Sequence, residues 1–582
     1  MLIKDFSSPA VRRLRQRFRH LYGARERQCV DRLSMLIGRY GLGLNPVERL
    51  EPWSERDTVL ITYGDMVRSP EDTPLQTLNR FLRDHLANGE IRSVHILPFF
   101  PYSSDDGFSV IDYRDVNPEL GDWNDIMAIA KHHKLAVDLV LNHVSRRSQW
   151  FQDYVSGIQP ASDYFIEVSP TENVASVVRP RNRPLLLATN TRNGIRHVWT
   201  TFSEDQIDLD FSNPDVLFEF LDILFFYISR GAQIFRLDAI AYLWKRLGTS
   251  CIHLPETHEV VKLFRDVLEL IAPNSLLLTE TNVPHEENIS YFGHGDEAHM
   301  VYQFSLPPLL LHALQTGKGA YLTQWAKSLG TPYSGCTYLN FTASHDGIGV
   351  RPLEGLVPDA DLQTLVETTR QRGGHVSTKA NSDGSESPYE LNITYLDALA
   401  DPGDPDEEMR IRRFLCSQAV PLELRGIPGI YFHSLVGASN DVEGVEQKGY
   451  PRAINRHKWD RDTLEARLRD PSSRHARILN EYSCMLRVRT SHSAFHPDAD
   501  QRVLELGDAV FALLRSAPDG SEVVLAINSL RATSVTVDAT RVCNELGAVG
   551  QWVDLLTETT VDIASDPLEL SPYRTVWLKP NN

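Results

Sequence analysis

The sequence has few cysteines, no long apolar run and no excess of positive charge. Its six cysteines lie far apart among 582 residues and form no CxxC pair, which argues against a zinc ribbon or a redox motif and favours reduced thiols. The N-terminus lacks the apolar core of a signal peptide, and the longest buried-looking run, LDILFFYI, is too short to span a bilayer. The net charge of −18 argues against nucleic acid as a partner. We therefore expect a cytoplasmic protein.

Short apolar runs that read as buried parallel strands recur along the chain. Between several of them lie stretches such as LQTLNRFLRDHLAN, whose apolar spacing of three and four is typical of amphipathic helices. The eight runs are VLITY (59–63), VHILPF (94–99), LAVDLVL (135–141), AQIFRL (232–237), SLLLT (275–279), MVYQF (300–304), CTYLNF (336–341) and GIYF (429–432). Strands that alternate with helices in this number predict an α/β fold, a (β/α)8 TIM barrel.

A barrel of this kind needs roughly 250 residues, so the chain has room for further domains. Loop-like segments such as RPRNRP and GGHVSTKANSDGSESP interrupt the barrel pattern, and the tail alternates apolar and polar residues as antiparallel strands do. The Arg-rich N-terminus is expected to form a helix packed on the barrel with its basic face in solvent. The predicted divisions are a helical N-terminal extension (1–55), a barrel in three parts (56–143, 212–346 and 401–496), inserted B and B' regions (144–211 and 347–400, the second a loop or lid) and a C-terminal antiparallel β domain (497–582).

Charged clusters follow several of the predicted strands. They are LNHVS (141–145), FRLDAI (235–240), LLTETN (277–282) and TASHDGIG (342–349). In a β/α barrel the C-terminal strand ends meet at one face, where active sites are assembled. Asp238, Glu280 and Asp346 are therefore expected to converge there.

In this order the four clusters resemble the four sequence regions of the α-amylase superfamily, glycoside hydrolase family 13. Within it the chain is similar to sucrose-phosphorylase-like enzymes. The segments that carry this narrower resemblance are SSDDGFSVIDY (103–113), RPR (179–181), DQIDLDFSNPDV (205–216), GTSCIHL (248–254), FSLPPLLLHAL (304–314), SHDGIG (344–349) and NITYLDAL (392–399). The long N-terminal extension and ETNVPHEENISYFGHGDEAHM are more similar to the glucosylglycerate phosphorylase branch.

The resemblance implies catalytic roles for the three carboxylates. In a retaining mechanism one carboxylate attacks the anomeric carbon, while a second carboxyl about 5 Å away protonates the leaving oxygen. The family pattern makes Asp238 the nucleophile, Glu280 the acid/base and Asp346 a holder of sugar hydroxyls. Arg236 lies two residues before Asp238 on the same strand face, so its cation is expected to keep the nucleophile ionised, whereas Glu280 needs a raised pKa.

Further residues match positions that hold the glucosyl ring in the resembled enzymes. For Asp105 the neighbouring Asp106 is a rival, and for Arg456 a structural salt bridge is the alternative. The predicted substrate-binding residues are Asp105, His143, Arg236, His345, Arg456 and Gln206.

A phosphorylase also needs an anion site that outcompetes water. Arg181 and Tyr389 match the two loops that receive phosphate and the sugar acceptor in sucrose phosphorylases, and an arginine fork suits phosphate oxygens. The chain departs from those enzymes at Glu390, which stands where a glutamine is expected, and at Arg183, which is predicted to meet the carboxylate of glycerate. The alternative for Arg183 is a solvated loop charge.

The predicted function is reversible phosphorolysis of an α-D-glucoside, 2-O-α-D-glucosylglycerate, to α-D-glucose 1-phosphate. Alternatives are sucrose, sucrose 6-phosphate or glucosylglycerol phosphorylase, an α-glucosidase or transglucosidase, and a sugar-binding module without catalysis. The expected partners are the glucoside and inorganic phosphate, with no nucleic acid and no membrane, and a homodimer stays open. No cofactor is expected, and Asn142 alone, where many amylases use a calcium ligand, makes no metal site.

Overall fold

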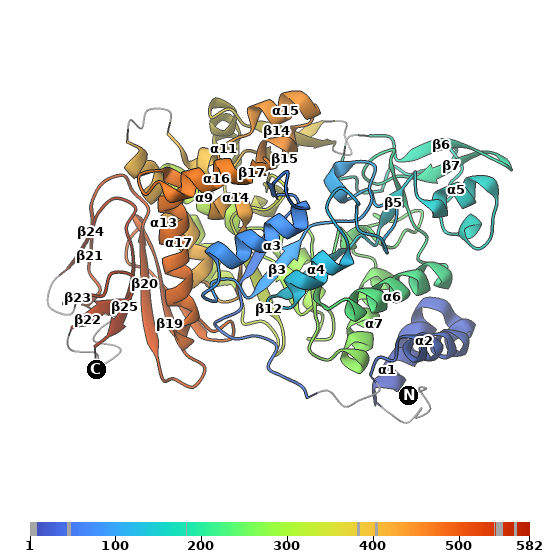
Figure 1. Cartoon of the computed structure of the whole chain (residues 1–582), viewed down its shortest axis with the longest axis horizontal. Helices are drawn as coiled ribbons and strands as arrows, with labels where there is room; N and C mark the ends of the chain where they lie inside the picture. Colours follow the sequence, from blue (N-terminus) through green and yellow to red (C-terminus); the bar gives the residue numbers. More distant parts are fainter. Residues whose placement is uncertain are drawn as a thin grey trace.

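The computed structural model describes residues 9–43, 48–181, 183–380, 385–401, 406–540, 542, 551–563 and 567–581. At its centre eight parallel strands close into a barrel, as the apolar runs predict (Figure 1). In chain order they are β1 (Val59–Thr62), β3 (Ser93–Ile96), β4 (Lys134–Leu139), β9 (Ala232–Leu237), β10 (Leu276–Thr279), β11 (Met300–Tyr302), β12 (Thr337–Phe341) and β16 (Ile427–Tyr431). The last strand pairs with the first, Leu60 lying opposite Ile430, so the sheet has no free edge.

Helices cover the outside of the barrel. Each presents an apolar face to the strands; in α3 this face consists of Leu75, Leu78, Phe81 and Leu82, and Thr73 caps the helix start by accepting from Gln76 N. The main covering helices are α3 (Pro74–His85), α4 (Trp123–Ala130), α6 (Pro214–Ser229), α7 (Pro255–Ile271), α9 (Leu306–Thr316), α13 (Glu407–Glu423) and α17 (Arg474–Thr490).

Two long βα connections carry small sheets above the C-terminal face of the barrel. The first contains β5 (His143–Ser145) paired with β8 (Gln206–Asp208), helix α5 (Gln149–Ser156), and the hairpin of β6 (Leu186–Thr191) and β7 (Gly194–Trp199). The second contains helix α11 (Asp359–Gln371) and a three-stranded sheet of β13 (Ile348–Gly349), β15 (Glu386–Asn392) and β14 (His375–Ala380). Segments far apart in sequence thereby overhang the strand ends.

The C-terminal strands form an antiparallel sheet that packs against the barrel helices. Its six strands, in spatial order, are β18 (Asp500–Leu504), β19 (Val510–Ser516), β20 (Val523–Ser529), β25 (Thr575–Pro580), β22 (Trp552–Asp554) and β23 (Thr559–Val561). Glu423 of α13 is fully buried at this junction and accepts from Trp577 Nε1 and Asn528 Nδ2, both at 2.6 Å. The carboxylate therefore ties the barrel to the sheet.

The N-terminal helices α1 (Pro9–Tyr22) and α2 (Glu26–Tyr40) pack against α7 and α6. Their basic face differs from the solvated face that the sequence predicts. Arg13 and Arg17 both pair with Asp266 of α7, at 2.6 and 3.1 Å, and Arg32 pairs with Asp215 of α6 at 2.6 Å. Acidic side chains on the covering helices attract these arginines, a complementarity that the sequence pattern of one helix does not reveal. Among the described residues, no helix combines the length and the apolar content needed to cross a bilayer.

Candidate active site

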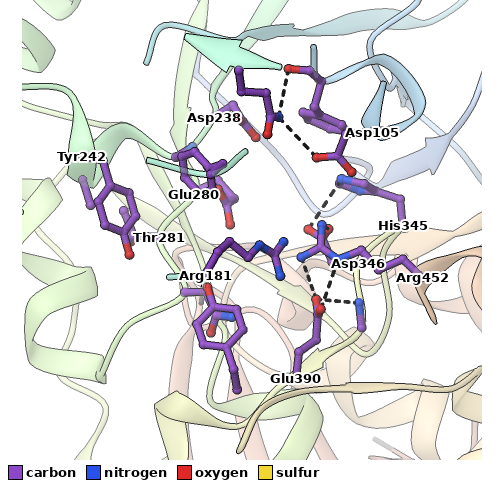
Figure 2. A pocket seen from close by; sticks show the side chains of 18 of the residues that line it. Asp105, Arg181, Asp238, Tyr242, Glu280, Thr281, His345, Asp346, Glu390 and Arg452 are labelled. Carbon is purple, nitrogen blue, oxygen red and sulfur yellow. Dashed lines mark hydrogen bonds and ion pairs between the residues drawn. The ribbon is translucent and has the colours of Figure 1, made fainter. Parts of the chain in front are cut away.

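A cavity opens at the C-terminal ends of the barrel strands, under the two overhanging segments (Figure 2). Its lining residues surround about 770 Å³ of space, part of which is open to solvent. Asp238 follows β9, Glu280 follows β10, and Asp346 lies five residues beyond the end of β12. All three line the cavity. The structure thus brings together the carboxylates that the sequence predicts to converge.

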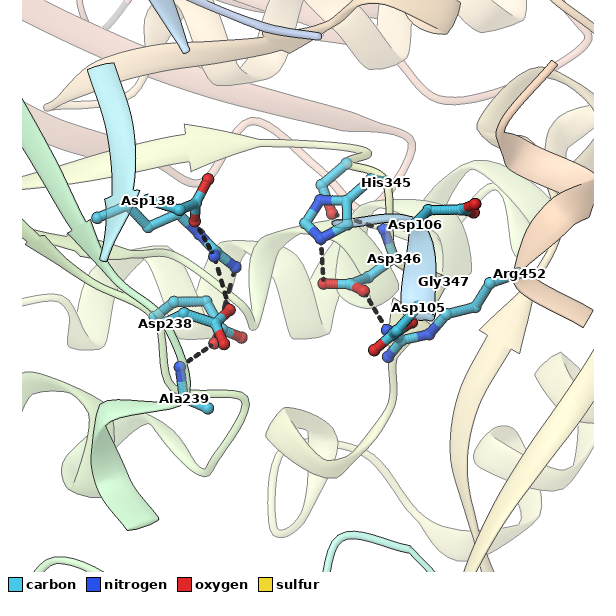
Figure 3. A network of polar contacts seen from close by, with 12 residues as sticks. Asp105, Asp106, Asp138, Asp238, Ala239, His345, Asp346, Gly347 and Arg452 are labelled. Atoms are coloured by element: carbon cyan, nitrogen blue, oxygen red, sulfur yellow. Dashed lines mark hydrogen bonds and ion pairs between the residues drawn. The ribbon is translucent and has the colours of Figure 1, made fainter. Parts of the chain in front are cut away.

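Arg236 organises the first part of the cavity. Its Nη1 donates to Asp238 Oδ1 at 2.7 Å and to Asp138 Oδ1 at 2.5 Å, and its Nη2 lies 3.7 Å from Glu280 Oε2 (Figure 3). The backbone N–H of Ala239 donates to the same oxygen of Glu280 at 3.0 Å. Because Arg236 and Asp238 are two residues apart at the end of β9, their side chains share one face of the sheet.

At Asp238 burial opposes the cation of Arg236, an effect that the sequence-based expectation does not include. Burial raises the pKa of Asp238, with Arg236 opposing the rise and Glu280 adding to it. Burial likewise raises the pKa of Glu280. Asp138 shares the cation of Arg236, and the carboxyls of Asp238 and Glu280 are both desolvated, neither of which the sequence pattern reveals. Asp238 and Glu280 therefore titrate as a pair, and the shorter contact with Arg236 favours the negative charge on Asp238.

Asp346 lies across the cavity among cations. Its Oδ1 is 2.5 Å from Arg452 Nη1, and its Oδ2 is 3.5 Å from His345 Nε2. Burial would raise the pKa of Asp346, but Arg452 and His345 lower it below its ordinary value. His345 in turn stacks on Phe108, with ring centroids 4.8 Å apart. Asp346 is therefore held ionised, which suits a group that accepts hydrogen bonds from hydroxyls.

Three of the six predicted ring-binding residues, Asp105, His143 and Gln206, lie together in the cavity wall, whereas Arg236 and Arg456 do not line the cavity. Gln206 Nε2 is 3.4 Å from Asp105 Oδ2 and 3.2 Å from His143 Nε2, and all three residues line the cavity. His143 Nε2 is also 2.9 Å from the carbonyl of Phe108. The neighbouring strands β5 and β8 supply His143 and Gln206, so their pairing sets this distance.

The structure separates Asp105 from Asp106. Asp106 Oδ2 accepts from Arg456 Nη1 at 2.8 Å and from the hydroxyl of Tyr450, and Asp106 lines a neighbouring hollow. Asp105 faces the cavity, with its Oδ1 3.9 Å from the same arginine nitrogen. This geometry favours Asp105 as the residue that meets the substrate. Arg456 forms a salt bridge with Asp106, which is the alternative that the sequence left open for this arginine.

Arg181 and Tyr389 meet at the remaining side of the cavity. The guanidinium carbon of Arg181 lies 5.8 Å from the centroid of the Tyr389 ring, although the two residues are far apart in sequence. Burial raises the pKa of Tyr389, with Arg181 opposing, so its hydroxyl keeps its proton and can donate. Arg183, in contrast, is exposed and is absent from the lining of the cavity. Its predicted contact with glycerate stays a prediction.

Arg452 is a lining residue that the sequence reasoning missed. It lies four residues before Arg456 in YPRAINRHKW, a segment in which the sequence reasoning considered only the second arginine. Besides Asp346 it binds Glu390 through two nitrogens, at 2.9 and 3.1 Å. Glu390 lines the cavity as predicted, but its carboxylate is already occupied.

Asn142 is engaged by a lysine. Lys245 Nζ donates to Asn142 Oδ1 at 2.5 Å and lies 2.6 Å from Asp208 Oδ2. The ammonium therefore neutralises the buried acid beside Asn142. No group of three His, Cys, Asp or Glu side chains suited to hold a metal ion occurs within the described ranges.

Several known proteins are similar to this chain in sequence and in fold. Residues 84–334 match the model of the α-amylase catalytic domain. The chain is 48% identical over 535 residues, 91% of either chain, to the glucosylglycerate phosphorylase of Spirochaeta thermophila. It is 44% identical to the glucosylglycerate phosphorylase of Escherichia coli, over 91% of this chain and 93% of that one.

More distant relatives include other phosphorylases. Identity to the sucrose phosphorylase of Bifidobacterium adolescentis is 32%, over 75% of this chain and 85% of that one. The crystal structure of sucrose 6F-phosphate phosphorylase from Thermoanaerobacter thermosaccharolyticum superposes with a TM-score of 0.72 at 25% identity, covering 89% of this chain and 98% of that one. The chain therefore belongs to the α-amylase superfamily, in the phosphorylase branch that contains the glucosylglycerate and sucrose phosphorylases.

Proposed function

We propose that this chain catalyses the reversible phosphorolysis of 2-O-α-D-glucosylglycerate to α-D-glucose 1-phosphate and glycerate. The names of its relatives support the reaction class and the substrate. The observation that carries the proposal is the pair of Arg181 and Tyr389, which lines the same cavity as the carboxylates of Asp238 and Glu280. A hydrolase with these carboxylates needs only access for water, whereas a phosphorylase needs an anion site.

In the first half of the proposed reaction, a carboxylate oxygen of Asp238 attacks C1 of the glucosyl group. The bond between C1 and the glycerate oxygen breaks, and Glu280 gives its proton to that oxygen. The product is a glucosyl ester of Asp238. The raised pKa of Glu280 supports this step, because a carboxyl that keeps its proton can act as the acid.

In the second half, an oxygen of phosphate attacks C1 of the ester. The ionised Glu280 takes the proton of that oxygen, the ester bond breaks, and the carboxylate of Asp238 is regenerated. Two inversions at C1 retain the α configuration. Arg181 and Tyr389 donate to the phosphate, and the local cation matters because the chain as a whole carries a net charge of −18 and repels anions.

The glucosyl group is proposed to lie between Asp346, His345 and the ring-binding side chains. Asp105, His143 and Gln206 provide one acid, one imidazole and one amide, and the amide of Gln206 lies within hydrogen-bonding reach of the other two. The ion pair of Arg456 and Asp106 lies next to Asp105 and is proposed to close that end of the cavity. A closed end accepts a single glucosyl unit and not a chain.

The proposed compartment is the cytoplasm. All five cysteines within the described residues are free thiols, and the sixth, Cys543, lies outside those residues. Free thiols are usual in reducing compartments.

The proposed oligomeric state is a monomer or a homodimer. Light scattering of the purified protein distinguishes the two.

The function is tested by incubating the protein with α-D-glucose 1-phosphate and one acceptor at a time, with phosphate release as the readout. The acceptors are glycerate, glycerol, fructose and fructose 6-phosphate. We expect release with glycerate to exceed that with each other acceptor by at least about tenfold. Preference for fructose or glycerol would assign sucrose or glucosylglycerol as the glucoside, and phosphate release that no acceptor stimulates would indicate a hydrolase.

A further inference from the structure

Arg452 joins two carboxylates from different segments of the cavity wall. Its Nη1 lies 2.5 Å from Oδ1 of Asp346, which follows β12. Its Nη2 and Nε donate to the two oxygens of Glu390, on β15, at 2.9 and 3.1 Å (Figure 2). The guanidinium thus spans the glucosyl side and the phosphate side of the cavity.

Glu390 is buried, and three N–H donors bind its carboxylate. Its side chain is 1% exposed, and Oε1 accepts from the backbone N–H of Gly347 at 2.9 Å as well as from Arg452. A Cβ at Gly347 would lie 2.6 Å from Cγ of Glu390, so this approach needs a glycine. With both oxygens bound to the protein, Glu390 has little capacity left for a ligand.

The charge of Glu390 is the difficulty that Arg452 resolves. Tyr389, the proposed phosphate donor, is its neighbour in the chain, and both residues line the cavity. An isolated carboxylate at this place would repel phosphate, and its burial without a partner would cost free energy. The two-pronged contact of Arg452 offsets this charge in part, since the same guanidinium also faces Asp346, and it fixes the geometry of the carboxylate.

We propose that the Arg452–Glu390 ion pair is a positioning element for the anion site. It offsets the charge of the carboxylate beside Tyr389 and fastens β15 to the loop of Asp346, so that phosphate meets the donors of Tyr389 and Arg181 against a weaker facing negative charge. This inference rests on the proposed function, since it takes phosphate to be the ligand on that side.

The pair is tested with Arg452→Gln, Glu390→Gln and the double variant, using α-D-glucosyl fluoride as donor. The measurement is the partition of the glucosyl-enzyme between glucose and glucose 1-phosphate as inorganic phosphate is varied. This partition reports only the second half-reaction, so a slower attack on the donor does not affect it. The half-partition concentration is the phosphate concentration at which both products form equally.

Arg452→Gln is expected to raise the half-partition concentration about tenfold or more, because Glu390 is left uncompensated. Glu390→Gln alone should change it by less than about threefold. The double variant should recover most of the loss, whereas its rate of glucosyl fluoride consumption should stay as low as that of Arg452→Gln, because the contact with Asp346 is not restored. A purely structural role would give no such recovery.

The double variant decides the question. A half-partition concentration below half that of Arg452→Gln supports the proposal, and any other value, including an unchanged one in Arg452→Gln itself, overturns it. If Arg452→Gln does not fold, Arg452→Met, which also removes the charge, replaces it in the same cycle with Glu390→Gln. Lys134→Gln is the matched control, since it breaks an ion pair of 2.7 Å with Asp57 at the opposite end of the barrel and should leave the partition unchanged.

The wild-type protein distinguishes a failure of the proposed function from a failure of the role proposed for the Arg452–Glu390 ion pair. If it forms no glucose 1-phosphate at any phosphate concentration, the proposed function fails and the anion role of the pair fails with it. If it forms glucose 1-phosphate but the double variant shows no recovery, only the role of the pair is lost.

Discussion

Asp238 accepts a hydrogen bond from Arg236 Nη1 at 2.7 Å, and the same nitrogen donates to Asp138 at 2.5 Å. The arginine therefore serves one carboxylate that lines the cavity and one that is buried behind it. This shared cation positions Asp238 and stabilises its negative charge, while burial acts in the opposite direction. Because only Asp238 lines the cavity, separate substitutions of Asp238 and Asp138 should have different effects on turnover.

Asp238→Asn should reduce turnover by about 10³-fold or more, because the isosteric amide cannot form the glucosyl ester. The measurement is phosphate release from α-D-glucose 1-phosphate with glycerate, together with the thermal midpoint, which should shift little. Asp138→Asn is the matched control, since it removes the negative charge of the other carboxylate that Arg236 Nη1 contacts while keeping an acceptor oxygen there. It should retain at least tenfold more turnover than Asp238→Asn, and equal losses would place the effect on Arg236 and not on a nucleophile.

Glu280→Gln should slow reaction with the glucoside by about 10²- to 10⁴-fold and reaction with α-D-glucosyl fluoride much less, because fluoride leaves without a proton. Burial raises the pKa of Glu280, so the wild-type acid stays protonated to higher pH than an ordinary glutamic acid. The rate with the glucoside should therefore fall on the basic side as the acid ionises. Equal losses on both donors would contradict the acid/base role.

Arg181→Ala should raise the phosphate requirement about ten- to more than a hundredfold, because a charge-assisted hydrogen bond contributes roughly 1.5 to 3 kcal/mol. Hydrolysis should gain a larger share, since the ester still forms at Asp238 and water meets a weaker competitor. The measurement is the ratio of glucose to glucose 1-phosphate against phosphate concentration. Arg192→Ala, an exposed arginine of the same inserted segment, is the control. An unchanged phosphate dependence in Arg181→Ala would remove Arg181 from the anion site.

Glu423→Gln should reduce the dependence of stability on pH. Burial raises the pKa of Glu423 from 4.5 to about 7, so the unfolded chain ionises before the folded one. Stability is therefore fully present below about pH 4.5 and is lost as pH rises through about 7, by ~2 kcal/mol between pH 5 and 8.

The measurement is the free energy of unfolding in guanidinium at pH 5 and pH 8 for wild type and Glu423→Gln. The difference between the two proteins should shift toward the variant at pH 8, even if the amide loses one of the hydrogen bonds from Trp577 and Asn528. A difference that stays constant with pH would show that Glu423 does not titrate in this range.

The sequence by itself determined the barrel and the meeting of its acids. Eight apolar runs coincide with the eight barrel strands, because strands buried on both faces must be almost wholly apolar. Once the strands are parallel, their C-terminal ends share one face, so residues that follow them, such as Asp238 and Glu280, converge whatever the loops do. The apolar pattern of the strands and the closure of the barrel are enough to predict that these two acids meet.

The tertiary structure decided what depends on contacts between distant segments. Asp105 and Asp106 are neighbours in sequence, and only the location of Arg456 and Tyr450 assigns one to the cavity and the other to a salt bridge. Likewise the sequence predicts that Glu390 binds a ligand in the cavity. In the structure its carboxylate pairs with Arg452, which belongs to a different loop. Charge and desolvation act through space, over distances that the chain order does not encode, and the protonation of these groups follows from the fold.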